Sequence, residues 1–415
     1  MSLRRQLGVS LLVQGAGSAS LLLATLWLGA SLGPEQQGAF SRTKAEIEFV
    51  AALAMFGLPQ ALFYFVKSSR LGGDAALRWA AGSAFLALPI TLLYTLLQHP
   101  RLSPWPVVAL ALAVGLGVFQ GQLRALLLVG QRTEWFNVVT AWPQLVLLAG
   151  VLVLVATGTA HEQRWPWLFA LAFGSAAVFA LWRLKGAANA APASAAIGWR
   201  ELGHYGLAAW LAAALYTAAI LLVQRWVEHR SGAAVLGVFT MALTLVQVPL
   251  TPVSYAAPLL FRRWMERPGA QASQRWALML FGALLGIAAL VWLAAPLWPR
   301  LGLGSGYDGL ARALAVLLVG GAAEAASRVL GVNANASGTP WVAVRAEAAR
   351  WIVLGGGLVA LPSGLMAMCA LWSVAALAAA AVFAVEMKPR GLRGIFTAKD
   401  AKIAKSAKEE KEDKE

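Results

Sequence analysis

The sequence predicts an all-α, polytopic membrane protein with about twelve transmembrane helices. Of its 415 residues, 59% are hydrophobic and only 13% are charged. Soluble domains are about 45–50% apolar and about 25% charged, so a soluble fold of this length would lack polar residues for its surface. The apolar residues also form long runs, and a helix needs about 20 mainly apolar residues to cross a bilayer.

The apolar runs that meet this length requirement are separated by short connections. In chain order they cover residues 8–30, 39–66, 79–97, 105–129, 135–157, 166–183, 204–224, 235–260, 276–298, 309–332, 341–361 and 363–386. Arg4 and Arg5 precede the first run as in a signal peptide, but the many runs that follow favour an uncleaved first span.

The longest connection, residues 184–203, separates six runs from six and is rich in alanine, with glycine and proline. We therefore expect an N-terminal unit over 1–183 and a C-terminal unit over 204–386. A charged tail over 387–415 completes the chain. Its last part, 397–415, has as many acids as lysines, which is typical of a solvated extension, although its lysine-rich start is also suited to contact anionic membrane lipids.

Lysine and arginine are unevenly distributed between the two sides of the membrane. Loops on the side of the N-terminus carry clearly more of them than loops on the opposite side. Loops rich in lysine and arginine stay in the cytoplasm, so both termini are predicted to be cytoplasmic. Helix orientation thus explains the net charge of +15, and we expect no nucleic-acid partner.

An internal repeat relates the two halves. Residues 38–41 (GAFS) align with residues 237–240 (GVFT), and Pro59 then aligns with Pro258. Proline inside a helix removes a hydrogen bond and bends the helix. Pro59, Pro249, Pro252 and Pro258 are therefore predicted to bend their spans, either as static kinks or as gates.

Four charged residues open the second span. Arg42 and Glu46, and likewise Lys44 and Glu48, are four residues apart and can pair along a helix. An ionisable residue within a span usually faces a partner or a wet cavity. We expect Arg42 and Lys44 to attract an anionic substrate and Glu46 and Glu48 to bind a coupling ion or balance charge. Alternatively, 31–48 is a solvated loop.

The later spans carry further charges. Glu324 and Arg328 are again four residues apart, among small residues that let helices approach closely. They form either a structural pair or a pair in the lumen, where Arg328 would attract the anionic substrate and Glu324 would balance charge or couple an ion. Arg350 is favoured as a lumenal phosphate ligand, because its fixed guanidinium offers bidentate donors. Arg345 is expected to be an interfacial anchor.

Motifs for enzyme chemistry or cofactor binding are absent from the sequence. The four histidines lack metal-ligand spacing, and no GxxxxGK[ST] phosphate loop occurs. The single cysteine, Cys369, lies in an apolar run and is expected to pack as a small hydrophobe. We therefore expect a protein that is not an enzyme and holds no metal or cofactor.

Two pairs of sequence stretches resemble a known family. Residues 32–40 (LGPEQQGAF), followed by 57–61 (GLPQA), resemble the first loop and second span of the polysaccharide-export flippases. Residues 333–340 (NANASGTP) and 362–365 (PSGL) are similar to the family's links around the eleventh span. These flippases act on O-antigen-type lipid-linked oligosaccharides and belong to the multidrug/oligosaccharidyl-lipid/polysaccharide exporter superfamily.

The resemblance implies two six-helix lobes around a central cavity, in a bacterial inner membrane. It implies an alternating-access flippase that moves an undecaprenyl-pyrophosphate-linked oligosaccharide to the periplasmic leaflet, driven by an ion gradient. Its partners would be this polyprenyl-linked glycan, membrane lipids and the glycan polymerase and chain-length machinery of polysaccharide biosynthesis.

Three alternatives remain open at this stage. A cation-coupled multidrug exporter of the same superfamily would have more acids and aromatics than arginines in its lumen. A membrane-embedded glycan polymerase or ligase would carry a large periplasmic loop, and the outer loops here are short. A scaffold that transports nothing would tolerate loss of Arg42 and Arg350 together.

Overall fold

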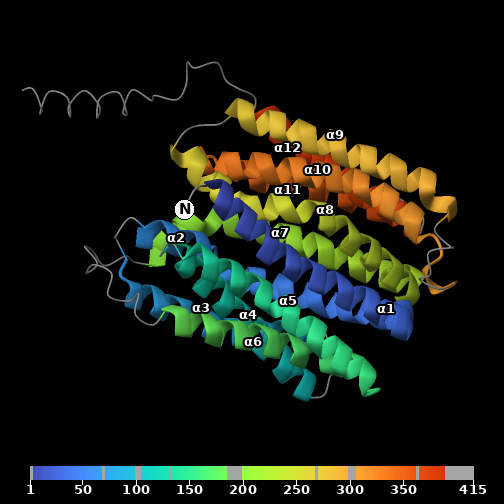
Figure 1. Cartoon of the computed structure of the whole chain (residues 1–415), viewed down its shortest axis with the longest axis horizontal. Coiled ribbons are helices and arrows are strands. Elements are labelled where there is room, and N and C mark those ends of the chain that lie inside the picture. Colours follow the sequence, from blue (N-terminus) through green and yellow to red (C-terminus); the bar gives the residue numbers. More distant parts are fainter. Residues whose placement is uncertain are drawn as a thin grey trace, which may run out of the picture.

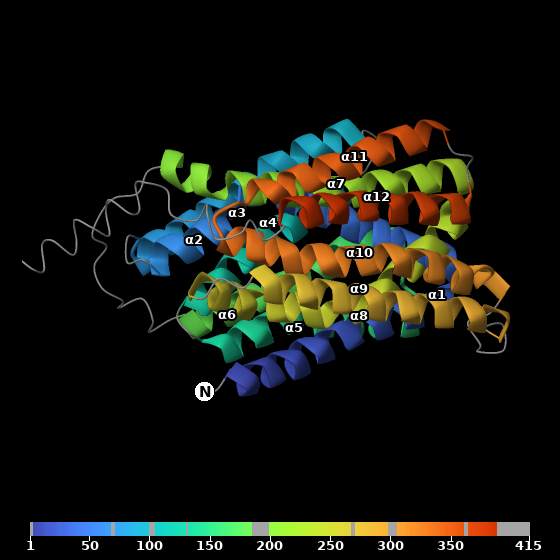
Figure 2. The ribbon, with the colours of Figure 1, turned by 90° about the horizontal axis from the view of Figure 1, so that it is seen from above.

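The computed structural model describes residues 3–67, 71–98, 104–129, 132–184, 199–266, 270–297, 305–360 and 364–387. Within these residues the regular structure is entirely helical, and ten helices are long and apolar enough to cross a membrane. The long helices run side by side in one bundle (Figures 1 and 2). The predicted all-α, polytopic fold class is therefore confirmed.

The helices follow the order of the predicted spans. The first half of the chain contains α1 (Leu3–Met55), α2 (Leu58–Lys67), α3 (Gly73–Gln98), α4 (Pro104–Val129), α5 (Thr133–Ala156), the 3-10 turn η1 (Glu162–Arg164) and α6 (Trp165–Leu184). The second half contains α7 (Trp199–Ser231), α8 (Ala233–Glu266), α9 (Ala270–Ala294), the 3-10 turn η3 (Ser305–Tyr307), α10 (Leu310–Ala336), α11 (Trp341–Ala360) and α12 (Leu365–Glu386).

The 53-residue α1 contains the first two predicted spans. Its backbone leaves helical geometry at Gly33, where φ is 81°, and the second helical part begins at once with Pro34. Proline suits the first position of a helix because its missing N–H has no partner there anyway. The charged residues from Arg42 to Glu48 thus lie in a helix, and the alternative of a solvated loop over 31–48 is wrong.

The second predicted span, 39–66, is divided at Phe56 and Gly57, whose φ angles are 47° and 67°. Pro59 follows this break, in the first turn of α2. The predicted span is thus interrupted directly before Pro59, at a helix start where proline is tolerated, and the role of Pro59 as a kink or a gate stays a prediction. By contrast, α8 passes through Pro249, Pro252 and Pro258 without ending, and their role as kinks or gates stays a prediction.

A further helix of membrane length, α11, corresponds to the predicted span 341–361, although it is not among those ten apolar helices. It carries Arg345, Glu347 and Arg350 within 20 residues, yet it lies parallel to its neighbours in the bundle (Figure 2) and packs on α7 and α12. With α1 crossing twice and α11 included, the described helices provide the expected twelve crossings.

The two largest clusters of buried apolar side chains lie in different halves of the chain, as expected of two lobes of helices. One core draws its buried residues from positions 24–172, and the other from positions 219–375. The extensive packing of α1 against α8 joins the lobes. Between α6 and α7, residues 185–198 of the predicted linker 184–203 lie outside the described residues, as do residues 388–415 of the predicted tail.

The structure gives the internal repeat a geometric basis. Gly33 and Gly232, which the repeat aligns, both have positive φ, and each immediately precedes a helix that returns across the bundle. The aligned Gly38 and Gly237 meet face to face where α1 packs on α8. A Cβ atom on Gly237 would lie only 1.9 Å from the carbonyl oxygen of Pro34. Glycine there lets the two backbones touch.

Candidate functional site

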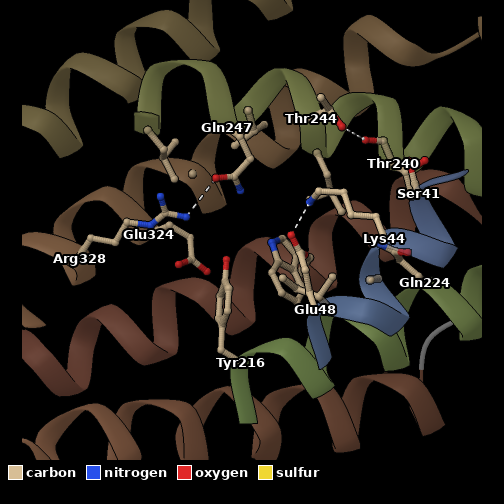
Figure 3. A pocket seen from close by; sticks show the side chains of 17 residues that line it. Ser41, Lys44, Glu48, Tyr216, Gln224, Thr240, Thr244, Gln247, Glu324 and Arg328 are labelled. Carbon is tan, nitrogen blue, oxygen red and sulfur yellow. Dashed lines mark hydrogen bonds and ion pairs between the residues drawn. The ribbon is translucent and has the colours of Figure 1, made fainter. Parts of the chain in front are cut away.

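A cavity of about 240 Å³ lies between the two lobes (Figure 3). Its walls come from α1, α7, α8, α10 and α12, so both halves of the chain contribute. The lining residues that carry polar groups are Ser41, Lys44, Glu48, Tyr216, Gln224, Thr240, Thr244, Gln247, Glu324, Arg328 and Trp372. Alanine, leucine, isoleucine, valine and glycine complete the walls.

The α1 wall of the cavity presents an ion pair. Nζ of Lys44 lies 2.8 Å from a carboxylate oxygen of Glu48, one helical turn further along α1. Both side chains are partly exposed, at 35% and 46%. The predicted pairing of these two residues is confirmed, and both lie at the cavity as Figure 3 shows.

The α10 wall presents the guanidinium of Arg328. It donates to Oε1 of Gln247 at 3.1 Å and to the hydroxyl of Ser254, both on α8. Within the described part of the chain it has no carboxylate at ion-pair distance. The expected pairing of Arg328 with Glu324 is therefore wrong: Glu324 turns toward a different arginine.

That arginine is Arg350, which sits behind the cavity wall rather than on it. Its Nη1 lies 2.8 Å from Glu324, and its Nε donates to Glu347 at 2.8 Å. The rings of Tyr216 and Trp372 each lie 5.2 Å from its guanidinium carbon. Arg350 is only 1% exposed, so the prediction that it lines the lumen is wrong.

Charge in this region is balanced over four residues. Arg350 faces two carboxylates, so the buried triad formed by Arg350, Glu324 and Glu347 carries one net negative charge when both acids are ionised. Arg328, one turn from Glu324 on α10, supplies a positive charge beside it. A buried charge is costly unless it is paired. The triad pairs Arg350 with Glu324 and Glu347, while Arg328 contacts only the neutral side chains of Gln247 and Ser254 within the described residues and faces the cavity.

Sequence reasoning did not include Glu347, Tyr216 or Gln247 among the site residues. Glu347 was detectable in principle, because it lies three residues from Arg350 and shares its helix face. Tyr216 and Gln247 carry no such signal, since their importance comes from helices that are distant in sequence.

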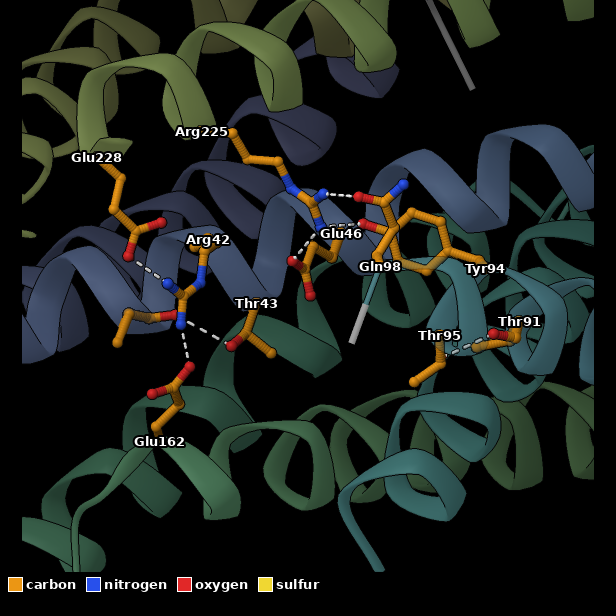
Figure 4. Close-up of polar contacts among 11 residues, drawn as sticks. Arg42, Thr43, Glu46, Thr91, Tyr94, Thr95, Gln98, Glu162, Arg225 and Glu228 are labelled. Atoms are coloured by element: carbon orange, nitrogen blue, oxygen red, sulfur yellow. Dashed lines mark hydrogen bonds and ion pairs between the residues drawn. The ribbon is translucent and has the colours of Figure 1, made fainter. Parts of the chain in front are cut away.

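Two ion-pair networks connect the lobes at the end of the bundle opposite the start of α1 (Figure 4). Arg42 of α1 pairs with Glu162 of η1 and with Glu228 of α7. Arg225 of α7 lies 2.8 Å from Glu46 of α1. Arg42 and Glu46 therefore do not pair with each other, and neither lines the cavity, which corrects both expectations.

The second network reaches a third helix. Arg225 also donates to the hydroxyl of Tyr94 at 2.7 Å and to the side-chain carbonyl of Gln98, both on α3. Because α7 belongs to the C-terminal half and α1 and α3 to the N-terminal half, these contacts hold the two halves together at that end of the bundle.

Contacts between the lobes also exist toward the opposite end. Nε1 of Trp210 donates to the carbonyl oxygen of Leu53 at 2.9 Å. The rings of Phe63 and Phe261 meet with centroids 6.5 Å apart. The cavity thus lies between two sets of contacts that join the halves of the chain.

Arg345 lies 57% exposed near the start of α11 and is paired with Glu386, consistent with an anchor at the membrane surface. No three histidine, cysteine, aspartate or glutamate side chains among the described residues are grouped as metal ligands.

No protein-family model matches the sequence, and no curated protein matches it either. Solved structures do match. A mutant of the Vibrio cholerae MATE transporter VcmN superposes with a TM-score of 0.64 and 17% identity, covering 93% of this chain and 97% of that one. The chain has the fold of the MATE transporters. At this level of identity, the likeness establishes the fold and nothing finer.

Two further matches show the breadth of this fold. One is the inward-facing conformation of a multidrug resistance MATE family transporter of the MOP superfamily (TM-score 0.62, 13% identity, 92% and 97% coverage). The other is a MOP superfamily transporter from Pyrococcus furiosus (TM-score 0.63, 14% identity, 92% and 94% coverage), described as having a binding pocket of reverse polarity that suggests a different function.

Proposed function

We propose that this protein is a membrane transporter that exports an amphipathic molecule through the cavity between its lobes by alternating access. The observation that carries the proposal is the cavity itself, which combines aromatic and aliphatic walls with charges of both signs. Its position between two sets of inter-lobe contacts suits a substrate site that opens to one side at a time. We place the protein in a bacterial inner membrane with cytoplasmic termini.

The size and chemistry of the cavity favour a small organic substrate. Pockets for small molecules typically measure about 300–1,000 Å³, and about 240 Å³ lies just below this range. An oligosaccharide of several sugars exceeds that volume. Tyr216 and Trp372 offer apolar surface, while Glu48 can attract a cationic group. Multidrug-type export is therefore the first candidate, in line with the multidrug transporter that shares the fold.

Arg328 favours a second candidate, the flippase of a polyprenyl-pyrophosphate-linked oligosaccharide. Its guanidinium faces the cavity and is bound only by neutral acceptors, so its charge is available to an anion. Guanidinium groups bind phosphate through parallel hydrogen bonds. On this proposal, a wider state of the cavity admits the glycan, and the partners are the lipid-linked glycan and its polymerase.

Transport assays separate the two candidates. The purified protein is reconstituted in proteoliposomes with a pH gradient, and uptake of the amphipathic cation ethidium is followed. We expect ethidium transport, with Glu48→Gln lowering the rate about tenfold because a charged contact is lost. Arg275→Gln, at an exposed arginine away from the cavity, serves as the control and should leave the rate unchanged.

The flippase candidate is tested in cells depleted of the protein. Two results together would favour the second candidate over the first. Lipid-linked glycan would accumulate at the cytoplasmic face, and the Arg328→Gln variant would fail to relieve this accumulation; the protein would also not transport ethidium. If neither ethidium nor lipid-linked glycan moves, the transport proposal is wrong.

A further inference from the structure

Two arginines meet a cluster of aromatic rings where α5 begins and α6 ends. Arg183, in the last turn of α6, has its guanidinium carbon 3.5 Å from the ring centroid of Trp135 and 3.9 Å from that of Trp182. The ring of Phe179 lies 5.4 Å away. The guanidinium is therefore held in one place by stacking on two indole rings, a contact that cation–π attraction strengthens.

Stacking occupies the faces of the guanidinium but leaves its N–H donors unused. These donors project from the edge of the plane. In the described part of the chain none of the side-chain donors of Arg183 has an acceptor, and its Nε is buried without one. Buried donors are almost always satisfied, so Arg183 has donors available for an acceptor beyond the described residues.

A second guanidinium lies at the same point. Arg132, directly before α5, donates from Nη1 to the backbone carbonyl oxygen of Arg183. The C-terminal end of a helix carries a partial negative charge that favours cations, which accounts for one donor of Arg132. Neither arginine has an ion pair within the described residues, although the exposed Glu134 lies close by in sequence.

The surface around this cluster is apolar and faces outward. Trp182 is 57% exposed, and Leu171 and Val178, 62% and 68% exposed, precede it on the same face of α6. Their spacing of seven and eleven residues places all three in one stripe along the helix. The stripe belongs to a helix that takes no part in the cavity, which α1, α7, α8, α10 and α12 line.

The cluster lies at the end of the bundle where α1 begins (Figure 1). The distribution of lysine and arginine predicts that this end faces the cytoplasm, and that surface of a membrane is rich in anionic lipid. An exposed apolar stripe that ends at two cations is complementary to an anionic phospholipid. The acyl chains would lie along the stripe, and the phosphate would lie at the arginines.

We propose that Arg132 and Arg183 bind the phosphate of an anionic phospholipid, with an acyl chain lying along Leu171 and Val178. The ring clamp of Trp135 and Trp182 holds the guanidinium of Arg183 with its donors directed at the headgroup. This lipid site is independent of the transport proposal, because it shares no residue with the cavity.

The test measures lipid retention by native mass spectrometry of the full-length protein. It is purified from nanodiscs that contain either phosphatidylglycerol or phosphatidylcholine alone. We expect the unmodified protein to retain phosphatidylglycerol, and Arg132→Gln with Arg183→Gln to lower retention about tenfold or more, since charge-assisted hydrogen bonds are lost. Arg183→Lys, which keeps the charge but not the planar fork, should lower retention in part.

A matched control lies at the same end of the bundle. Arg275, at the start of α9, is exposed beside the exposed Trp276, but no ring clamps it. Arg275→Gln should leave retention unchanged. Loss of retention in Arg275→Gln equal to that in the double variant would overturn the proposal, because general attraction to the membrane would then explain binding.

Two other results would also overturn the lipid site. One is equal retention of phosphatidylcholine and phosphatidylglycerol by the unmodified protein. The other is displacement of phosphatidylglycerol by an excess of inorganic phosphate, which would show that a free anion is the ligand. If the double variant does not fold, Arg183→Lys alone decides, and undiminished retention in it refutes the proposed phosphate contact.

Discussion

Replacing Arg350 by methionine should destabilise the protein more than any other single exchange in the buried triad. Methionine fills similar space but leaves Glu324 and Glu347, which are 6% and 9% exposed, without their shared cation. Removing one partner of a buried ion pair typically costs about 3–5 kcal/mol. We expect the thermal unfolding midpoint in detergent, followed by tryptophan fluorescence, to fall on the order of 10 °C.

The cause can be isolated by removing the orphaned charges as well. The triple variant Arg350→Met, Glu324→Gln, Glu347→Gln buries no charge in the triad and should recover most of the lost stability. Arg345→Met, which breaks the exposed pair with Glu386, should leave the unfolding midpoint nearly unchanged, because exposed ion pairs contribute little to stability.

The reasoning fails if Arg350→Met melts within about 2 °C of the unmodified protein, the shift expected for less than ~1 kcal/mol. It also fails if the triple variant is no more stable than Arg350→Met alone. In either case, the ion pairs of the triad would not be the source of the stability that Arg350 gives to the protein.

Two further predictions concern the contact between the lobes. Gly237→Ala should lower the unfolding midpoint by several degrees, because its methyl group would collide with the backbone of Pro34 at a cost of about 1–3 kcal/mol; Gly286→Ala, where the space is open, should be tolerated, and equal midpoints would contradict the close packing. Glu46→Gln should weaken the contact with Arg225. A cysteine placed at Thr240 should then react faster with a membrane-impermeant thiol reagent that is added outside. An unchanged labelling rate would show that this ion pair does not hold the outer side closed.

Several features were determined by local sequence. The length of each apolar run sets the number of crossings, since a helix must be long enough to satisfy its backbone within the bilayer. Spacing along one helix placed Lys44 beside Glu48. The aligned stretches at residues 38–41 and 237–240 marked the helices that meet between the lobes.

Spacing along a single helix could not predict the ion pairs that form between helices. Spacing suggested that Arg42 pairs with Glu46 and Arg328 with Glu324, yet both acids bind arginines from other helices. An i,i+4 pair contributes only about 0.2–0.5 kcal/mol on an isolated helix. An unpaired charge in the apolar interior costs several times more, so packing that brings a second guanidinium within reach overrides the local choice.

Composition and span length by themselves thus determined that the chain is a helical membrane protein with several charged residues inside its spans. Only the tertiary structure decided which of those charges face the cavity. Lys44, Glu48, Glu324 and Arg328 line it, while Arg350 is enclosed behind its wall. The physical reason is that the sequence of a helix fixes which side chains share a face of that helix. The neighbouring helices determine whether that face points to lipid, to protein or to the lumen.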